Sequence, residues 1–98
     1  MLNQVLLVGR LVKEPTLTEN EKVKMCFITL AVQRSYKNEK GEFETDFIDC
    51  LLLNGVAENT VEYCKKGDLI GIKGSLQVYN KNLQVRVDRV TFLTSKKD

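Results

Sequence analysis

Few residues in this chain offer the chemistry that catalysis or metal binding requires. It contains no histidine, which removes the usual general base and the partner that activates a serine or cysteine nucleophile. Its three cysteines, Cys26, Cys50 and Cys64, lie far apart in apolar surroundings and form no CxxC pair, so we interpret them as buried free thiols. Carboxylates such as Glu42 and Glu44 fall in a polar connecting segment. The sequence therefore predicts no enzyme, no metal site and no cofactor.

Aromatic rings and cations form a more informative pattern. Three rings, Tyr36, Phe47 and Tyr79, fall beside a charged segment or on strand positions opposite the expected core. Six basic side chains accompany them in the sequence: Arg10, Lys13, Arg34, Lys37, Lys73 and Arg86. Rings stack on nucleobases and cations attract phosphates, and each stacked base contributes roughly 1–3 kcal/mol. Each ring could instead pack in the core, and each cation could be an ordinary solvated side chain.

Length and composition indicate one soluble globular domain. The chain has 98 residues, of which 43% are hydrophobic and one is proline. We expect no membrane span and no secretory signal, and therefore a cytoplasmic protein. The net charge is only +2, but residues 1–38 carry six basic and three acidic side chains, residues 39–68 three and eight, and residues 69–97 six and one. This distribution alone is weak support for nucleic-acid binding.

Alternation of apolar and polar residues predicts five strands. They are expected at Asn3–Val12, Met25–Arg34, Thr45–Asn54, Leu69–Tyr79 and Leu83–Leu93. In the second strand, Cys26, Ile28, Leu30 and Val32 should face the core, with Phe27 on the other side. The connections are expected to be a polar turn at Glu19–Lys24, a hairpin loop at Ser35–Glu44 and a tight turn at Asn80–Asn82.

One segment changes to helical spacing. Val56–Lys66 is predicted as a short helix with Lys65 and Lys66 in its last turn and Gly67 at its C-cap. Five strands with one helix between the third and fourth predict an all-β, five-stranded barrel of the oligonucleotide-binding (OB) type. We expect this domain to span residues 1–94 and residues 95–98 to fray. The aromatic residues expected to pack rather than bind are Phe27, Phe43, Tyr63 and Phe92.

Several segments resemble one known family in collinear order. Asn3–Leu11 is similar to the first strand of bacterial single-stranded DNA-binding proteins. The other family-like segments are 27–32, 41–42, 46–48, 57–59, 63–67 and 71–76. Together they cover nearly the whole chain, and seven matches in order with family-like spacing make a chance similarity improbable.

This resemblance implies sequence-independent binding and protection of single-stranded DNA in replication, recombination and repair. Tyr36, Phe47 and Tyr79 resemble family positions that stack on bases, and Leu53 matches a fourth aromatic position. The chain departs from the family at Asp49, whose charge would repel phosphate unless a cation such as Arg86 pairs with it. The turn at residues 80–82 is also shorter than the family's long basic hairpin. We therefore expect weaker binding than in the strongest family members.

The resemblance also implies a homotetramer, or at least a dimer joined through the first strands, because outward-facing Leu51 and Leu53 would be difficult to leave exposed. The sequence ends in Lys96-Lys97-Asp98, so we expect no acidic C-terminal tail of the kind that recruits partner enzymes in this family. A domain cut from a longer protein and a naturally tail-less relative both remain open. The alternative function is an OB-fold module for primosome assembly or protein interaction, in which nucleic-acid binding is secondary.

Overall fold

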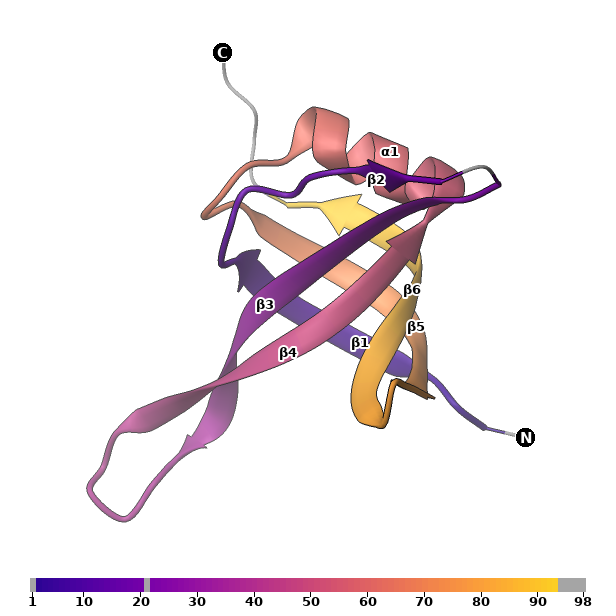
Figure 1. The fold of residues 1–98 in the computed structure, drawn as a ribbon. Helices are drawn as coiled ribbons and strands as arrows, with labels where there is room; N and C mark the ends of the chain where they lie inside the picture. Colours follow the sequence, from indigo (N-terminus) through magenta and orange to yellow (C-terminus); the bar gives the residue numbers. More distant parts are fainter. Residues whose placement is uncertain (1, 21, 94–98) are drawn as a thin grey trace.

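The computed structural model describes residues 2–20 and 22–93, which form a closed barrel (Figure 1). In chain order, the elements are β1 (Val5–Leu11), β2 (Thr18–Glu19), β3 (Lys24–Lys37), β4 (Phe43–Leu53), α1 (Asn54–Tyr63), β5 (Leu69–Tyr79) and β6 (Asn82–Phe92). The predicted frayed end at residues 95–98 lies outside the described residues. The predicted five-strand, one-helix architecture is confirmed.

The barrel closes because β1 has two neighbours. The strand order is β1-β5-β6-β4-β3-β2, and β1 pairs in addition with β3. Most of β1 lies antiparallel to β5, but Arg10 and Leu11 also pair with Ala31 and Leu30 of β3. On the other side of the barrel, β4 and β6 pair in parallel over two residues each. The short strand β2 lies beside the start of β3, where the sequence predicted only a polar turn.

The interior follows the predicted alternation. Cys26, Ile28 and Leu30 of β3 are buried, and Val32 packs partly against the same core. The other strands contribute further fully buried side chains, namely Leu11, Cys50, Leu52, Ile70 and Val85. All three cysteines are buried and free, which confirms the interpretation from sequence. Burial, together with the nearby charge of Asp49, raises the pKa of the Cys50 thiol to about 12, so this thiol is protonated at neutral pH.

The β3–β4 hairpin is longer than predicted. The sequence suggested a loop from Ser35 to Glu44, but β3 continues to Lys37 and β4 begins at Phe43. A shift in pairing between Gln33 and Lys37 marks an irregularity within this extension. The hairpin therefore projects beyond the barrel as an arm, drawn at the lower left of Figure 1.

The helix covers one end of the barrel (Figure 1). It buries Ala57 and Thr60, and Val56 and Val61 pack partly against the core. The helix ends at Tyr63, so the prediction that it continues to Lys66 was wrong. Gly67, with φ of +90°, belongs to a separate turn in which the Asp68 N–H donates to the Lys65 carbonyl at 3.0 Å. That turn is tied to β1, because the Gly67 N–H donates to the Leu11 carbonyl at 2.9 Å.

The β5–β6 hairpin combines a tight turn with a bulge. Asn80 and Lys81 both have positive φ, at 51° and 68°, as a two-residue type I′ turn requires. Farther from the turn, Lys73 pairs with Arg89, whereas Gly74 pairs with Val87. Asp88 is therefore an extra residue on β6. A Cβ added at Gly74 would lie 2.1 Å from the Arg86 carbonyl oxygen, so the strands can approach this closely only because residue 74 is glycine.

We expect Gly74→Ala to reduce the free energy of unfolding by about 1–3 kcal/mol, because the strands must separate to accommodate the methyl group. The measurement is urea denaturation followed by circular dichroism. Gly55→Ala is the matched control, since a Cβ there meets nothing within 4 Å and alanine favours the helix by up to about 1 kcal/mol. Equal stability of the two variants would contradict the steric explanation.

Candidate nucleic-acid interface

One outer face of the barrel runs across β3, β4, β6 and β5. Across these strands, the directly paired residues are Phe27, Leu51, Arg86 and Ser75 in turn. Side chains of paired residues point to the same side of a sheet, as do alternate residues along each strand. We call this surface the aromatic face, because it carries Phe27, Phe47 and Tyr79.

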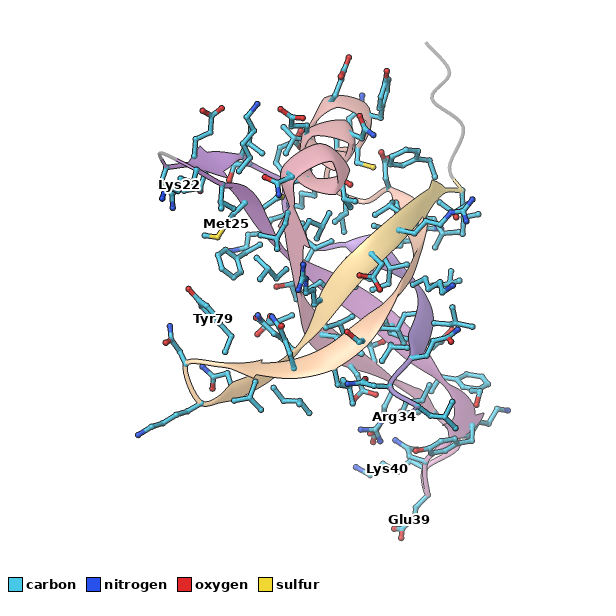
Figure 2. The ribbon with its side chains drawn as sticks, turned by 90° about the vertical axis from the view of Figure 1, so that its right-hand side faces the viewer. Lys22, Met25, Arg34, Glu39, Lys40 and Tyr79 are labelled. Carbon is cyan, nitrogen blue, oxygen red and sulfur yellow. The ribbon has the colours of Figure 1, made fainter. Side chains whose placement is uncertain are left out.

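Phe27 and Tyr79 meet on the aromatic face. Their ring centroids are 6.0 Å apart with planes tilted by 44°, and both rings are partly exposed. Figure 2 shows Tyr79 on the same side of the molecule as Met25 at the start of β3. Phe27, expected to pack rather than bind, therefore contacts another ring on the outer surface. The alternation predicted its outward position, since Phe27 lies between buried Cys26 and Ile28.

The other predicted stacking positions are accessible to different degrees. Phe47 is 66% exposed on β4 and Tyr36 is 63% exposed near the end of β3. Tyr36 lies on the projecting arm, within the irregular segment between Gln33 and Lys37, rather than at the centre of the aromatic face. Leu53 is half-buried at the end of β4, opposite Met25. The structure thus brings Phe47, Tyr79 and Leu53 onto one surface, with Tyr36 beyond it.

Three predicted cations lie beside the aromatic face. Arg10 pairs with Ala31, which in turn pairs with Phe47, so the guanidinium and this ring belong to the same row of side chains. Lys13 lines a pocket of about 250 Å³ together with Phe27. Arg86 is exposed on β6 and has no ion pair or side-chain hydrogen bond among the described residues. Arg10 also donates to the Gly67 carbonyl at 2.9 Å, which restrains its side chain.

Arg34 differs from these three cations, because carboxylates of the protein already neutralise its charge. It donates two hydrogen bonds to Asp46, at 3.0 and 2.9 Å, and one to Glu44 at 2.9 Å. The hydrogen bonds and charge of Arg34 lower the pKa of Asp46, so the pair stays intact at neutral pH and is lost only in acid. Asn38 adds a hydrogen bond to Glu44 at 3.0 Å. These hydrogen bonds join the two strands of the arm. Figure 2 labels Arg34 there.

Lys37 makes a ring contact on the same arm. Its ammonium group lies 5.7 Å from the centroid of the Phe43 ring, within the range of a cation–π interaction. Phe43 was expected to pack rather than bind, and its ring is exposed on the arm. Tyr63 and Phe92 are also exposed and contact each other with centroids 5.9 Å apart. These two rings form a surface pair at the helix end, outside the core.

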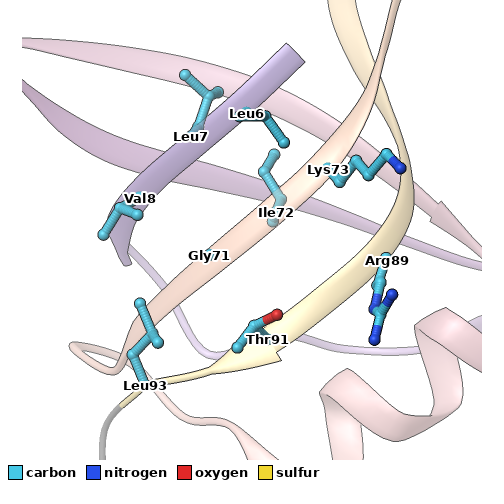
Figure 3. A pocket seen from close by; sticks show the side chains of 9 residues that line it. All are labelled: Leu6, Leu7, Val8, Gly71, Ile72, Lys73, Arg89, Thr91 and Leu93. Carbon is cyan, nitrogen blue, oxygen red and sulfur yellow. The ribbon is translucent and has the colours of Figure 1, made fainter. Parts of the chain in front are cut away.

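Lys73 lies in a second region of the surface. It is paired with Leu6 on β1 and with Arg89 on β6. Figure 3 shows these three side chains around a pocket of about 440 Å³ that Val8 and Leu93 also line. This surface is predominantly apolar, and its exposed leucines distinguish it from the aromatic face. Lys73 is therefore not grouped with Phe47 and Tyr79.

Asp49 lies on the aromatic face without a cation. Its carboxylate accepts a hydrogen bond from the Thr29 hydroxyl at 3.1 Å, and the described residues give it no ion pair with Arg86. Leu51, expected to be outward and exposed, is only 6% exposed, so it does not require a partner chain to cover it.

Within residues 2–20 and 22–93, no group of three histidine, cysteine or acidic residues could hold a metal ion. No described helix is long and apolar enough to cross a membrane.

Comparison with known proteins agrees with this architecture. Residues 2–94 match the model of the single-strand binding protein family. The chain is 49% identical over 78 residues to single-stranded DNA-binding protein B of Bacillus subtilis, covering 79% of this chain and 69% of that protein. It is 43% identical over 107 residues to single-stranded DNA-binding protein A of the same organism, covering 98% of this chain and 62% of that protein.

A solved structure is similar over nearly the whole fold. The wild-type single-stranded DNA binding protein from Thermus aquaticus superimposes with a TM-score of 0.80 at 26% identity, covering 97% of this chain and 52% of that one. The present chain thus spans only part of the length of the proteins that it matches. The family model covers nearly all of its residues, and the barrel is shared with a solved structure. This chain belongs to the single-strand binding protein family.

Proposed function

We propose that this protein binds single-stranded DNA with little dependence on base sequence and protects it during replication, recombination and repair. The observation that supports this most directly is the aromatic face, where Phe27, Phe47 and Tyr79 are exposed together on one side of a continuous sheet. Relatives of nearly 50% identity carry the name single-stranded DNA-binding protein. The function proposed is binding without catalysis, in the cytoplasm.

The mechanism follows from the two kinds of side chain on this face. Every base has a flat π surface, so rings accept any of the four bases by stacking. Arg10, Lys13 and Arg86 lie beside the rings, where they would attract the phosphates of the same strand. Tyr36 and Lys37 on the arm would extend this contact to further nucleotides. Such binding would hold the strand extended and keep its bases from pairing.

We further infer self-association through β1, as a dimer at least and as a homotetramer in the full assembly. Along β1, only Arg10 and Leu11 pair with β3, so the preceding residues have one strand edge without a partner in the described fold. Leu6 is 67% exposed and Val8 is 55% exposed, and both line the apolar pocket of Figure 3. An unpaired edge beside an exposed apolar surface favours pairing with a second chain.

Removal of the rings should weaken binding. We expect Phe47→Ala and Tyr79→Ala each to reduce affinity for a 35-nucleotide single strand by about tenfold, within the roughly 1–3 kcal/mol attributed to one stacked base. The double variant should bind still more weakly. Fluorescence anisotropy with a labelled strand measures these affinities. Phe92→Ala is the control, because it removes a ring that is as exposed as Tyr79 but lies at the helix end; equal losses in all variants would argue against the aromatic face.

The salt dependence of binding should distinguish free cations from paired ones. Arg86→Gln should lower the slope of log affinity against log salt by about 1, since one phosphate contact is lost. The double variant Arg34→Gln with Asp46→Asn keeps the net charge and should leave the slope unchanged, because Arg34 is already neutralised. Affinities measured at several salt concentrations give both slopes. A reduction in the double variant as large as that in Arg86→Gln would assign phosphate binding to Arg34.

The oligomeric state tests the proposed role of β1. Sedimentation equilibrium at micromolar concentration should give a mass at least twice the 11.2 kDa of one chain. Leu6→Glu with Val8→Glu should shift the protein toward the monomer, because two charges would enter the apolar contact. A wild-type monomer under these conditions would exclude the proposed assembly.

A further inference from the structure

A pocket of about 320 Å³ lies where β4 and β6 separate, between the aromatic face and the inward-facing side chains Ile48, Leu76, Leu83 and Val85. Phe47 and Asp49 line it from β4, Gln84 lines it from β6, and Val5 and Leu7 line it from β1. Pockets that bind small ligands range from roughly 300 to 1,000 Å³. The size is therefore suited to a single base inserted from a strand on the aromatic face.

Two polar side chains in this pocket retain unused hydrogen-bonding capacity. The Asp49 carboxylate accepts one hydrogen bond, from Thr29 through Oδ1, and no other among the described residues. Gln84 is only 6% exposed, and its amide nitrogen has no hydrogen-bond partner in the described part of the chain. A buried amide without a partner is unfavourable, so a ligand that supplies an acceptor would be bound more tightly.

The position of Asp49 relative to Phe47 is suited to reading a stacked base. The two residues are two positions apart on β4 and point to the same side, with Cα atoms about 7 Å apart. A base on the Phe47 ring, which is itself exposed, would direct one edge along the strand toward Asp49. The hydrogen bond from Thr29 fixes the carboxylate in place, so it is preorganised before the base arrives.

Guanine is the base whose edge complements these groups. Its Watson–Crick edge presents two adjacent donors, N1–H and the N2 amino group, next to the acceptor O6. A carboxylate accepts from two parallel N–H groups and cannot donate, and the Gln84 amide nitrogen is a donor. Thymine offers Asp49 a single N–H flanked by two carbonyl oxygens, which the negative charge repels. Proteins commonly read bases of single strands by such edge contacts.

We propose that Asp49 and Gln84 form a base-reading subsite that prefers guanine at the position stacked on Phe47. The subsite rests on the proposed binding of single-stranded DNA and refines it, since stacking elsewhere on the aromatic face remains independent of sequence. It also assigns a role to Asp49, whose charge would otherwise only weaken phosphate binding.

The test uses the full chain and three 15-nucleotide strands of thymidine, in which the central base is thymine, guanine or hypoxanthine. One OB fold covers roughly 4–16 nucleotides, so the strand can slide until the central base reaches the pocket. We expect guanine to bind roughly tenfold more tightly than thymine, with hypoxanthine between them because it lacks the N2 amino group. Affinities are measured by competition against a labelled thymidine strand.

Two variants test whether the preference for guanine over thymine depends on the side chains of this pocket. Asp49→Asn should reduce the ratio of guanine to thymine affinity to less than about twofold, while affinity for the thymidine strand rises because a negative charge is lost. Gln84→Met keeps the side-chain length and should lower the same ratio. Asp88→Asn is the matched control, since it removes an exposed carboxylate from β6 outside the pocket, and should retain the wild-type ratio.

The outcomes separate this proposal from the proposed function. Equal affinity of the wild type for all three strands overturns the base-reading subsite but leaves DNA binding intact. An unchanged ratio in either Asp49→Asn or Gln84→Met, with circular dichroism showing a folded protein, overturns it as well. Failure of the wild type to bind any of the three strands would instead overturn the proposed function.

Discussion

Closure of the barrel depends on β1 gaining a second neighbour, β3, immediately after Gly9. Up to this point β1 pairs with β5, and immediately after it Arg10 and Leu11 also pair with β3. A Cβ at Gly9 would lie 2.7 Å from the Ala31 carbonyl oxygen, so the approach of β1 to β3 requires the absence of a side chain. The same contact places Arg10 in one row with Ala31 and Phe47. The closure of the core and the position of a cation beside a ring therefore have one cause.

The alternation of the sequence was sufficient to predict the barrel, because each strand has one apolar side that must be buried. It predicted the inward positions of Cys26, Ile28 and Leu30, and it placed Phe47 outside. It could not predict the full length of β3 and β4, because the hairpin is charged and resembles a loop. Ion pairs between Arg34 and two carboxylates stabilise those strands, and such pairing depends on a register that local sequence does not contain.

The candidate site was predicted less completely than the fold. Periodicity distinguishes the two sides of a strand but not the neighbours of each side chain in space. The alternation placed Phe27 opposite the core, but it could not show that this ring contacts Tyr79 of β5. Gln84 gave no signal, because it falls on the outward side of the alternation with Arg86 and yet is buried. Arg34 and Lys73 resembled Arg86 in sequence. Only the structure shows that Arg34 is neutralised by carboxylates and that Lys73 lies beside the apolar surface of β1.

The extra residue on β6 has a consequence for the lengths that this strand can tolerate. Because Asp88 interrupts the pairing, Val87 and Val85 point into the barrel while Arg86 points outward. Loss of Asp88 would restore regular pairing, with Val87 still opposite Gly74, whereas loss of Arg86 would reverse every side chain from Val85 to the hairpin turn. Descendants of this sequence should therefore tolerate loss of the residue at position 88 but no other change in residue number along β6, whereas the loop at residues 38–42 can lengthen or shorten without disturbing the core.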